Sequence, residues 1–460
     1  MAKEYHVGEV NMVTLGFKYG ESEINLSLPE ENLKIIKNKS FPGIENPEKA
    51  VSEALDNPIG MEPISKLVSP GDKVSIIVDD VTRDTPTSIL FPIVYKKLKE
   101  AGIKNRDINI VMATGAHKRQ SEEDLLKRIG GRPSGDIKLS VHDPLDKSRL
   151  SLIGFTSLGT PVWINDEVAE SDFKIGIGSI RPHAEAGFSG GGKIILPGVS
   201  AWEAIGRNHI LFISRKSRIG ILEGNPFRED IEECAEIAGL NFIVNTVWNT
   251  ERKIAGVYAG HPIKAQREGV KTVKEICENR LDEKADILIM GFGPKDDTVW
   301  QIVGTAFTLS TIDRSVKKGG TILLIASCED GVYMPFKGVH HLNYEGTFKQ
   351  TQKFVELLTT SPSPEELFSI TLRGKAPYPE LGAKGVVLSQ LSKAVNLVMV
   401  SNNLKSEDVN WFGELVWGPD KALKNALEEH GRDANIIVMP NISGPEGCPS
   451  MKPFPYTEDS

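Results

Sequence analysis

Short apolar runs alternate with segments of helical periodicity along the first half of the chain. Runs rich in Val and Ile cover residues 73–80, 108–113 and 173–180, and the segments 87–101 and 122–129 between them have the apolar spacing of helices. Continuous apolar runs of this length indicate strands that are buried on both faces. Because the strands alternate with helices, the pattern predicts a parallel or mostly parallel sheet and favours the α/β fold class.

The same alternation restarts after a long charged segment, residues 262–280, which we expect to be a helix. Strand-like runs follow at residues 285–290, 321–326, 395–400 and 435–439. A chain of 460 residues is too long for a single hydrophobic core. We therefore expect two α/β domains with mostly parallel sheets, residues 1–282 and 283–445, with the active site in the cleft between them and residues 446–460 as a tail.

Two β-hairpins and one helix start can also be predicted from local patterns. Residues 12–28 alternate between polar and apolar around a turn, and residues 242–259 contain two apolar runs around a polar turn. Both patterns are typical of hairpins. Ser200 and Glu203 have the spacing of a capping box, which predicts a helix that begins there and ends near His209.

Composition narrows the class of partner and the compartment. The 62 acidic and 54 basic side chains give a net charge of −8. An acidic balance without a long basic run argues against nucleic acid as a partner. No apolar run has the length of a membrane span, and the first residues lack a signal-peptide core. We expect a cytoplasmic protein whose cysteines are not paired as disulfides, because their spacing fits neither a disulfide framework nor a zinc site: Cys234, Cys277, Cys328 and Cys448.

Chemically capable residues follow each of the three strands of the first half. Asp80 and Arg83 follow the first strand, His117 follows the second, and Arg181 and His183 follow the third. In parallel sheets, ligands bind beyond the carboxyl ends of the strands. Any one of these residues could be an ordinary loop residue, since loops are polar in general. Three in succession predict one shared site.

A glycine-rich loop, residues 187–193, follows the third strand and ends in Lys193. It satisfies most of the Walker A pattern, but Ile194 stands where a magnesium-binding Ser or Thr is required, which argues against a phosphate-cleaving loop. The loop can be a tight turn or a backbone nest that holds an anion. A lysine withdrawn from water beside it would have a lowered pKa and could attack a cofactor as a nucleophile.

Three histidines extend this picture. His117 and His183, on separate loops, can act as an acid and base pair because imidazole titrates near neutral pH. His209, at a predicted helix end, could cap that helix as an imidazolium or bind nickel, copper or zinc as a neutral imidazole. No HExxH motif is present, which argues against a zinc hydrolase. Two hypotheses remain: an α/β enzyme with a phosphate-bearing cofactor, and a phosphate- or nucleotide-binding α/β protein without hydride chemistry.

At these residues the sequence resembles the nickel-dependent lactate racemase family. The resemblance rests on a run of short motifs in the first half: Asp80-Val81-Thr82-Arg83, Gly115-Ala116-His117, Arg181-Pro182-His183, Ala186-Gly187-Phe188-Ser189-Gly190-Gly191, Lys193 and Asn208-His209. It covers the first predicted domain well and the second more loosely. It implies a racemase or epimerase that abstracts and returns a hydride at C2 of a 2-hydroxy acid.

The resemblance also implies a cofactor and site roles. Lys193 would carry, covalently, a pyridinium-3,5-dithiocarboxylic acid mononucleotide that holds nickel as a pincer, and His209 would be the protein ligand of the nickel. His117 and His183 would exchange the hydroxyl proton from opposite sides of the substrate. Cofactor maturation and nickel-insertion proteins would be partners. The loop would help to seat the cofactor through Ser189, Gly190, Gly191 and Gly192.

Substrate binding is where the sequence departs from the family. By resemblance, Arg83 would bind the substrate oxygen, oriented by Asp80, and Trp300 and Gln301 would contact the substrate. Gly304, however, stands where the family has a lysine that holds the substrate carboxylate. Losing such a charged hydrogen bond costs about 1.5–3 kcal/mol, so we expect a 2-hydroxy acid larger than lactate. Three residues could supply a replacement contact: Lys295, His340 and His341.

Overall fold

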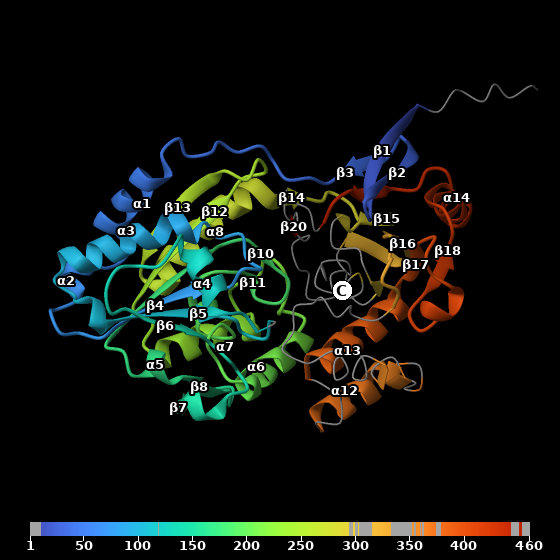
Figure 1. Ribbon diagram of the computed structural model, residues 1–460. Coiled ribbons are helices and arrows are strands. Elements are labelled where there is room, and N and C mark those ends of the chain that lie inside the picture. The colour runs from blue at the N-terminus through green and yellow to red at the C-terminus, as the bar shows by residue number, and fades with distance from the viewer. Residues whose placement is uncertain are drawn as a thin grey trace, which may run out of the picture. The chain divides into compact units, whose positions relative to one another are not determined.

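Two six-stranded sheets form the centres of two units of the chain (Figure 1). The large unit contains the described residues of 39–278 and 336–386, and the small unit those of 1–38, 279–335 and 387–460. The computed structural model describes residues 11–117, 119–293, 298–299, 302, 315–332, 352–353, 356–358, 360, 363–373, 379–442 and 450–452.

The sheet of the large unit is parallel except at one edge, where β13 runs antiparallel to β12. Its strands, in spatial order, are β13 (Ile254–Gly260), β12 (Phe242–Trp248), β9 (Phe173–Ser179), β4 (Val74–Asp79), β5 (Ile108–Ala113) and β6 (Lys138–Val141). The central strands are buried almost throughout, as their Val and Ile content predicts. Parallel pairing brings the carboxyl ends of β4, β5 and β9 to one edge of the sheet.

Helices cover both faces of this sheet. On one face, a large apolar cluster joins the strands to α1 (Pro47–Asp56), α3 (Thr87–Glu100) and α4 (Glu122–Ile129). On the other face, α8 (Pro262–Cys277) packs on β12 and β13, and the short turn η3 (Gly191–Ile194) packs on β9 and β4. The glycine-rich loop is therefore held against the sheet rather than projecting into solvent.

The sheet of the small unit is parallel throughout its described pairings. Its order is β18 (Glu414–Val416), β17 (Asn396–Val400), β16 (Val316–Ile325), β15 (Ala285–Gly291), β19 (Ile436–Met439) and β3 (Leu33–Ile35). The hairpin of β1 (Met12–Tyr19) and β2 (Ser22–Pro29) adds Phe17, Leu26 and Leu28 to its core, together with α14 (Pro419–His430).

The predicted fold class is confirmed. The elements whose ranges were predicted lie within a few residues of them: β4, α3, β5, α4, β9, α8, β15, β16, β17 and β19. The two predicted hairpins are also present, as β1–β2 and β12–β13. The division of the chain differs from the expected domains, residues 1–282 and 283–445, in two places. The described residues of 336–386 belong to the large unit and not to the second domain. Because β3 pairs with β19, the described residues before 39 belong to the small unit.

The predicted capping box is wrong. Helix α6 (Trp202–His209) begins after Ala201, and Ala201 makes no side-chain cap. The hydroxyl of Ser200 instead donates to the carbonyl of Ile195 at 2.7 Å, and Glu203 pairs with Lys147 on the surface. The local pattern resembled a cap, but a competing tertiary contact took the hydroxyl.

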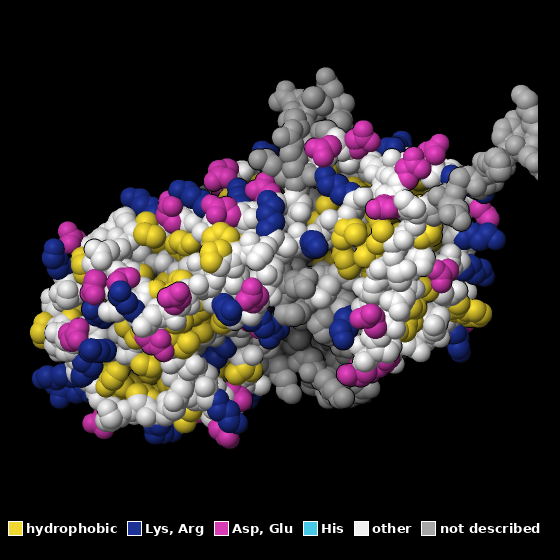
Figure 2. Space-filling view, turned by 90° about the horizontal axis from the view of Figure 1, so that it is seen from above, with side chains coloured by type: hydrophobic (Ala, Val, Ile, Leu, Met, Phe, Trp, Pro, Cys, Tyr) yellow, Lys and Arg dark blue, Asp and Glu magenta, His cyan; other side chains and the backbone are white. Residues whose placement is uncertain are grey.

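The remaining elements are short or lie around the sheets: α2 (Ile64–Leu67), η1 (Asn105–Asp107), η2 (Lys147–Arg149), β7 (Leu150–Phe155), β8 (Pro161–Asn165), α5 (Asp166–Ala169), β10 (Pro182–His183), β11 (Gly187–Phe188), η4 (Ile210–Ile213), α7 (Pro226–Ile237), β14 (Glu278–Arg280), α12 (Pro364–Leu372), α13 (Pro379–Ala394), η6 (Ser406–Asp408) and β20 (Ser450–Lys452). In the described part of the chain, none of the helices has the length and apolar character needed to cross a membrane. On the face in Figure 2, basic and acidic side chains are interspersed over the described residues.

Candidate active site

A cavity of about 210 Å³ lies where the loops after β4, β5 and β9 meet. At about 10–15 Å³ for each water it would hold roughly 14 to 21 waters, which is room for a small organic molecule. Nine of the predicted site residues line it: Asp80, Arg83, His117, His183, Ser189, Gly190, Gly191, Lys193 and His209. Gly192 lies beside the lining, while Trp300, Gln301, Gly304, Lys295, His340 and His341 fall outside the described residues.

His117 lies between a carboxylate and a guanidinium. Its Nδ1 is 2.6 Å from Oδ2 of Asp80, and its Nε2 is 2.8 Å from Nη2 of Arg83. Since a guanidinium can only donate, we assign the proton to Nδ1 and the lone pair to Nε2. Asp80 is itself fixed by the backbone N–H of Thr82 at 2.7 Å. Asp80 was expected to orient Arg83, but its carboxylate accepts from His117 and Thr82 and acts on Arg83 only through its charge.

This arrangement shifts both pKa values downward. Burial lowers the pKa of His117, the charge of Arg83 lowers it further, and Asp80 acts in the opposite direction. For Asp80, burial raises the pKa, but the hydrogen bond and charge of His117 together with Arg83 hold it well below its usual range. The pair is therefore an ionised carboxylate beside a neutral imidazole at neutral pH, which makes His117 a base.

His183 lies on β10, and Oε2 of Glu185 is 3.2 Å from its Nδ1. Burial lowers the pKa of His183 to about 4, with the nearby charges of Lys193 and Arg83 also lowering it and Glu185 raising it. Like His117, this residue is neutral at pH 7. Two neutral imidazoles thus line one cavity, and either can act as a base and return the proton once it has been taken up.

Lys193 lies in η3 with its amine in a setting that disfavours charge. Withdrawal from water lowers its pKa to about 7; Glu185 opposes the shift, and the charges of Arg83, Arg228 and Arg181 add to it. Its Nζ lies 5.7 Å from the centre of the Phe227 ring. A large share of these amines is neutral near pH 7, so Lys193 meets the condition for a nucleophile that can bond to a cofactor.

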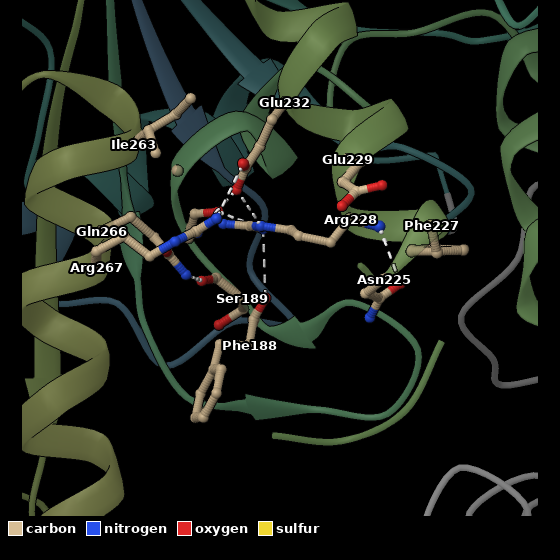
Figure 3. Close-up of polar contacts among 12 residues, drawn as sticks. Phe188, Ser189, Asn225, Phe227, Arg228, Glu229, Glu232, Ile263, Gln266 and Arg267 are labelled. Carbon is tan, nitrogen blue, oxygen red and sulfur yellow. Dashed lines mark hydrogen bonds and ion pairs between the residues drawn. The ribbon is translucent and has the colours of Figure 1, made fainter. Parts of the chain in front are cut away.

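Residues from α7 and α8 hold the glycine loop from behind (Figure 3). The guanidinium of Arg228, which is fully buried, donates through Nη1 to the carbonyls of Phe188 and Gly190 at 3.4 Å each. Gln266 donates to the carbonyl of Ser189 at 3.2 Å. These donors turn three consecutive carbonyls of the loop toward the helices, which fixes the backbone that carries Lys193.

Glu232 completes this support. It accepts from Nε of Arg228 at 2.6 Å and from Nη1 of Arg267 at 2.8 Å, so that one carboxylate holds two guanidinium groups. Figure 3 shows these side chains converging from α7 and α8 behind the loop. Because one partner is fully buried, this ion pair is largely shielded from solvent.

Several backbone N–H groups of the glycine-rich loop already have hydrogen-bond partners within the protein, so they are not available to bind an anion. The N–H groups of Ser189, Gly191 and Lys193 already donate to Arg181 O at 2.9 Å, Asn245 Oδ1 at 2.9 Å and Gly190 O at 3.4 Å, respectively. These internal bonds weaken the hypothesis of a phosphate-binding protein built on this nest.

His209, at the end of α6, is oriented for metal binding. Its Nδ1 is 2.7 Å from the carbonyl oxygen of Ile205, so Nδ1 donates and Nε2 carries the lone pair. A histidine that binds metal commonly has its other nitrogen fixed in this way. Among the described residues, no group of three or more His, Cys, Asp and Glu could hold a metal ion. A cofactor that supplies its own donor atoms would need one protein ligand, and Nε2 of His209 could be that ligand.

Comparison with known proteins identifies the family. The lactate racemase N-terminal domain family matches residues 19–220, a range that contains all nine lining residues named above. The lactate racemase of Lactiplantibacillus plantarum is 31% identical over 440 residues, which are 94% of this chain and 99% of that protein. The lactate racemase of Thermoanaerobacterium thermosaccharolyticum is 33% identical over 327 residues, 70% of this chain and 76% of that protein.

The chain belongs to the lactate racemase family. It is therefore an enzyme of the isomerase class. The structure of the lactate racemase apoprotein from Thermoanaerobacterium thermosaccharolyticum agrees with this, with a TM-score of 0.78, 29% identity and coverage of 93% of this chain and 98% of that one. A crystal structure of a Thermotoga maritima protein, 18% identical with a TM-score of 0.61 over 88% of this chain and 98% of that one, shares the fold.

Two positioning contacts of this lactate racemase family member could not be recognised in the sequence. Arg128, from α4, donates to the side chain and the carbonyl of Asp79 at 2.5 and 3.2 Å, and so clamps the end of β4 just before Asp80. Asp230, which is fully buried, accepts from Asn208 at 2.8 Å beside the metal-binding candidate. Each contact joins residues that are more than twenty positions apart. The sequence shows that these side chains are polar or charged, but not which of them meet.

Proposed function

We propose that this protein is a racemase or epimerase of a 2-hydroxy acid that uses a lysine-bound nickel-pincer nucleotide. The observation that carries the proposal is the convergence of His117, His183, Lys193 and His209 on one cavity. Family membership supplies the reaction class, and the cavity supplies the groups that such a reaction needs.

The cofactor would be held at two points. Lys193, with its lowered pKa, would carry the pyridinium-3,5-dithiocarboxylic acid mononucleotide, and Nε2 of His209 would bind the nickel. Ser189 and the glycines that follow would form the wall against which the group is seated, held by Arg228 from behind. When bound, this group supplies a reversible acceptor for the hydride of the substrate C2.

The protein's own residues would handle the proton. His117 and His183 are both neutral at pH 7, so either can accept the hydroxyl proton of a 2-hydroxy acid and return it later. Two bases are needed because the two enantiomers present the hydroxyl group from different directions. Arg83 donates to Nε2 of His117. When the substrate hydroxyl group binds to that nitrogen and displaces Arg83, the guanidinium would turn to the substrate oxygen.

The substrate would be larger than lactate. The proposal rests on the sequence resemblance, in which Gly304 stands where the family has a lysine that holds the substrate carboxylate. A pocket without that side chain would have more room and one charged contact fewer. An aryl, branched or sugar 2-hydroxy acid is the class expected. Trp300 and Gln301 would contribute substrate contacts, and separate maturation and nickel-insertion proteins would be needed to load the cofactor.

A racemisation screen tests the proposal. Protein produced together with cofactor maturation proteins would be incubated with single enantiomers of 2-hydroxy acids of graded size, and the products separated by chiral chromatography. We expect turnover of an acid larger than lactate by the wild type and none by His117→Ala or Lys193→Ala. Turnover that survives Lys193→Ala would contradict the tethered cofactor. Binding of phosphate or a nucleotide without turnover of any acid would favour the alternative, a phosphate- or nucleotide-binding protein without hydride chemistry.

A further inference from the structure

The carboxylate of Glu185 lies within contact distance of His183 inside the cavity. Glu185 is in the loop of residues 184–186 that joins β10 to β11, and its side chain is 12% exposed. The loop is held in place, since Asn225 donates to the backbone carbonyl of Glu185 at 2.7 Å. At Gly187, φ is +73° and a Cβ would meet the carbonyl of Ile221 at 2.0 Å, so only glycine lets the chain turn here. The carboxylate is therefore presented to His183 by a fixed turn.

Nδ1 of His183 has two neighbours that require opposite protonation. The backbone N–H of Ala186, at 3.4 Å, can donate to Nδ1 only if that nitrogen carries no proton. Glu185, at 3.2 Å, can accept only if it does. The carboxylate contact is shorter and charge-assisted, whereas 3.4 Å lies at the weak end of N–H hydrogen bonds. The balance favours a proton on Nδ1 and a lone pair on Nε2.

The other proposed base, His117, has the same arrangement. Oδ2 of Asp80 is 2.6 Å from Nδ1 of His117, and Nε2 accepts from Arg83. Asp80 and Glu185 come from different loops, after β4 and within the β10–β11 turn. Each of the two imidazoles thus has one carboxylate on Nδ1, which leaves Nε2 of each as its proton acceptor.

We propose that Glu185 is a positioning residue that holds His183 in the Nδ1–H tautomer, so that Glu185–His183 and Asp80–His117 form two matched carboxylate–histidine pairs, one for each enantiomer. The tautomer itself is independent of the reaction, but the assignment of the pairs to enantiomers rests on the proposed function. His183 also faces the positive charges of Lys193 and Arg83, and Glu185 is the carboxylate that offsets them and stabilises the imidazolium formed on proton uptake.

Histidine side-chain ¹⁵N NMR on full-length protein without cofactor tests the tautomer. The samples are the wild type, His183→Gln for assignment, Glu185→Leu, and the surface control Glu203→Gln, whose partner is Lys147. We expect the Nδ1–H form of His183 in the wild type and in the control. In Glu185→Leu we expect the Nε2–H form, because only the Ala186 N–H is left at Nδ1. Unchanged His117 signals in each variant would report an intact fold. An Nε2–H tautomer in the wild type, or no change in Glu185→Leu, would overturn the inference.

Kinetics of cofactor-loaded Glu185→Gln test the consequence for the reaction. We expect kcat to fall about 10- to 100-fold, the range typical for losing a residue that orients a functional histidine, with little change in KM and a shifted acidic limb of the pH profile. For the two directions of the reaction, the ratio of the kcat/KM values is fixed by the overall equilibrium. The two kcat/KM values must therefore fall together, while the two kcat values can fall by different factors. An unchanged pH profile would contradict the pairing. A confirmed tautomer in a protein that racemises nothing would refute the proposed function and leave the positioning role standing.

Discussion

Replacing Arg228 by methionine tests whether the glycine loop depends on a buried cation. In the wild type, Arg228 is fully buried, with Nε 2.6 Å from Glu232 and Nη1 at 3.4 Å from two loop carbonyls. After the substitution, Glu232 keeps Arg267 at 2.8 and 3.0 Å, so no uncompensated charge remains. What is lost is a few hydrogen bonds worth about 0.5–1.5 kcal/mol each. We expect the free energy of unfolding to fall by about 1–3 kcal/mol.

The reverse substitution should cost more. Glu232→Leu leaves the guanidinium of Arg228 buried with no carboxylate beside it, and breaking a buried pair from one side typically costs about 3–5 kcal/mol. Urea unfolding followed by circular dichroism measures both variants. Lys147→Met, which removes an exposed partner of Glu203, is the control and should change stability by less than about 1 kcal/mol. A loss in Arg228→Met equal to or larger than that in Glu232→Leu would refute this reasoning.

Four further outcomes are expected. Gly191→Ala should lower the free energy of unfolding by about 1–3 kcal/mol, because φ is +60° and the new Cβ would lie 3.2 Å from Nη2 of Arg228; equal urea midpoints would contradict this. With a pKa of about 7, Lys193 is charged below pH 7 and neutral above it, so the rate at which an acylating reagent labels it should reach a plateau just above pH 7. Mass spectrometry of pulse-labelled peptides measures this rate, and a rate that keeps rising beyond about pH 9 would indicate an ordinary lysine. Asp80→Asn should lower kcat about 100-fold or more, because a neutral amide replaces the carboxylate that accepts from Nδ1 of His117 and no longer stabilises its imidazolium; wild-type kcat would rule out that role. His209→Ala should retain the lysine adduct but lose nickel, measured as nickel per protein by plasma mass spectrometry. An undiminished nickel content would exclude His209 as a ligand.

The strands of the large unit and the location of the site could be predicted because both depend on local pattern and on a rule of topology. β4, β5 and β9 are continuous apolar runs, and a run of this kind fits a parallel strand buried on both faces. Once those strands are parallel neighbours, the loops that carry Asp80 and His117 must meet at one edge. The cavity at that edge follows from the sheet.

The features that escaped prediction depend on how the chain packs in three dimensions. Nothing in residues 33–35 shows that they pair with β19, about four hundred residues later, so the amino-terminal segment was assigned to the wrong unit. Ser200 has the spacing of a cap, but its hydroxyl is used by Ile195. Asp80 was expected to orient Arg83, but the loop geometry places its carboxylate against His117, and the spacing of the residues does not report that geometry.

The central claim is that a metal-bearing cofactor is tethered to Lys193, and intact-mass spectrometry combined with nickel analysis tests it most directly. The protein would be purified after production with and without cofactor maturation proteins, with Lys193→Arg as the matched control that keeps a cation at this position. We expect a mononucleotide-sized mass increase that maps to Lys193, with equimolar nickel, in the matured wild type and in neither control. Racemase activity in a sample that has neither the added mass nor the nickel would contradict the account.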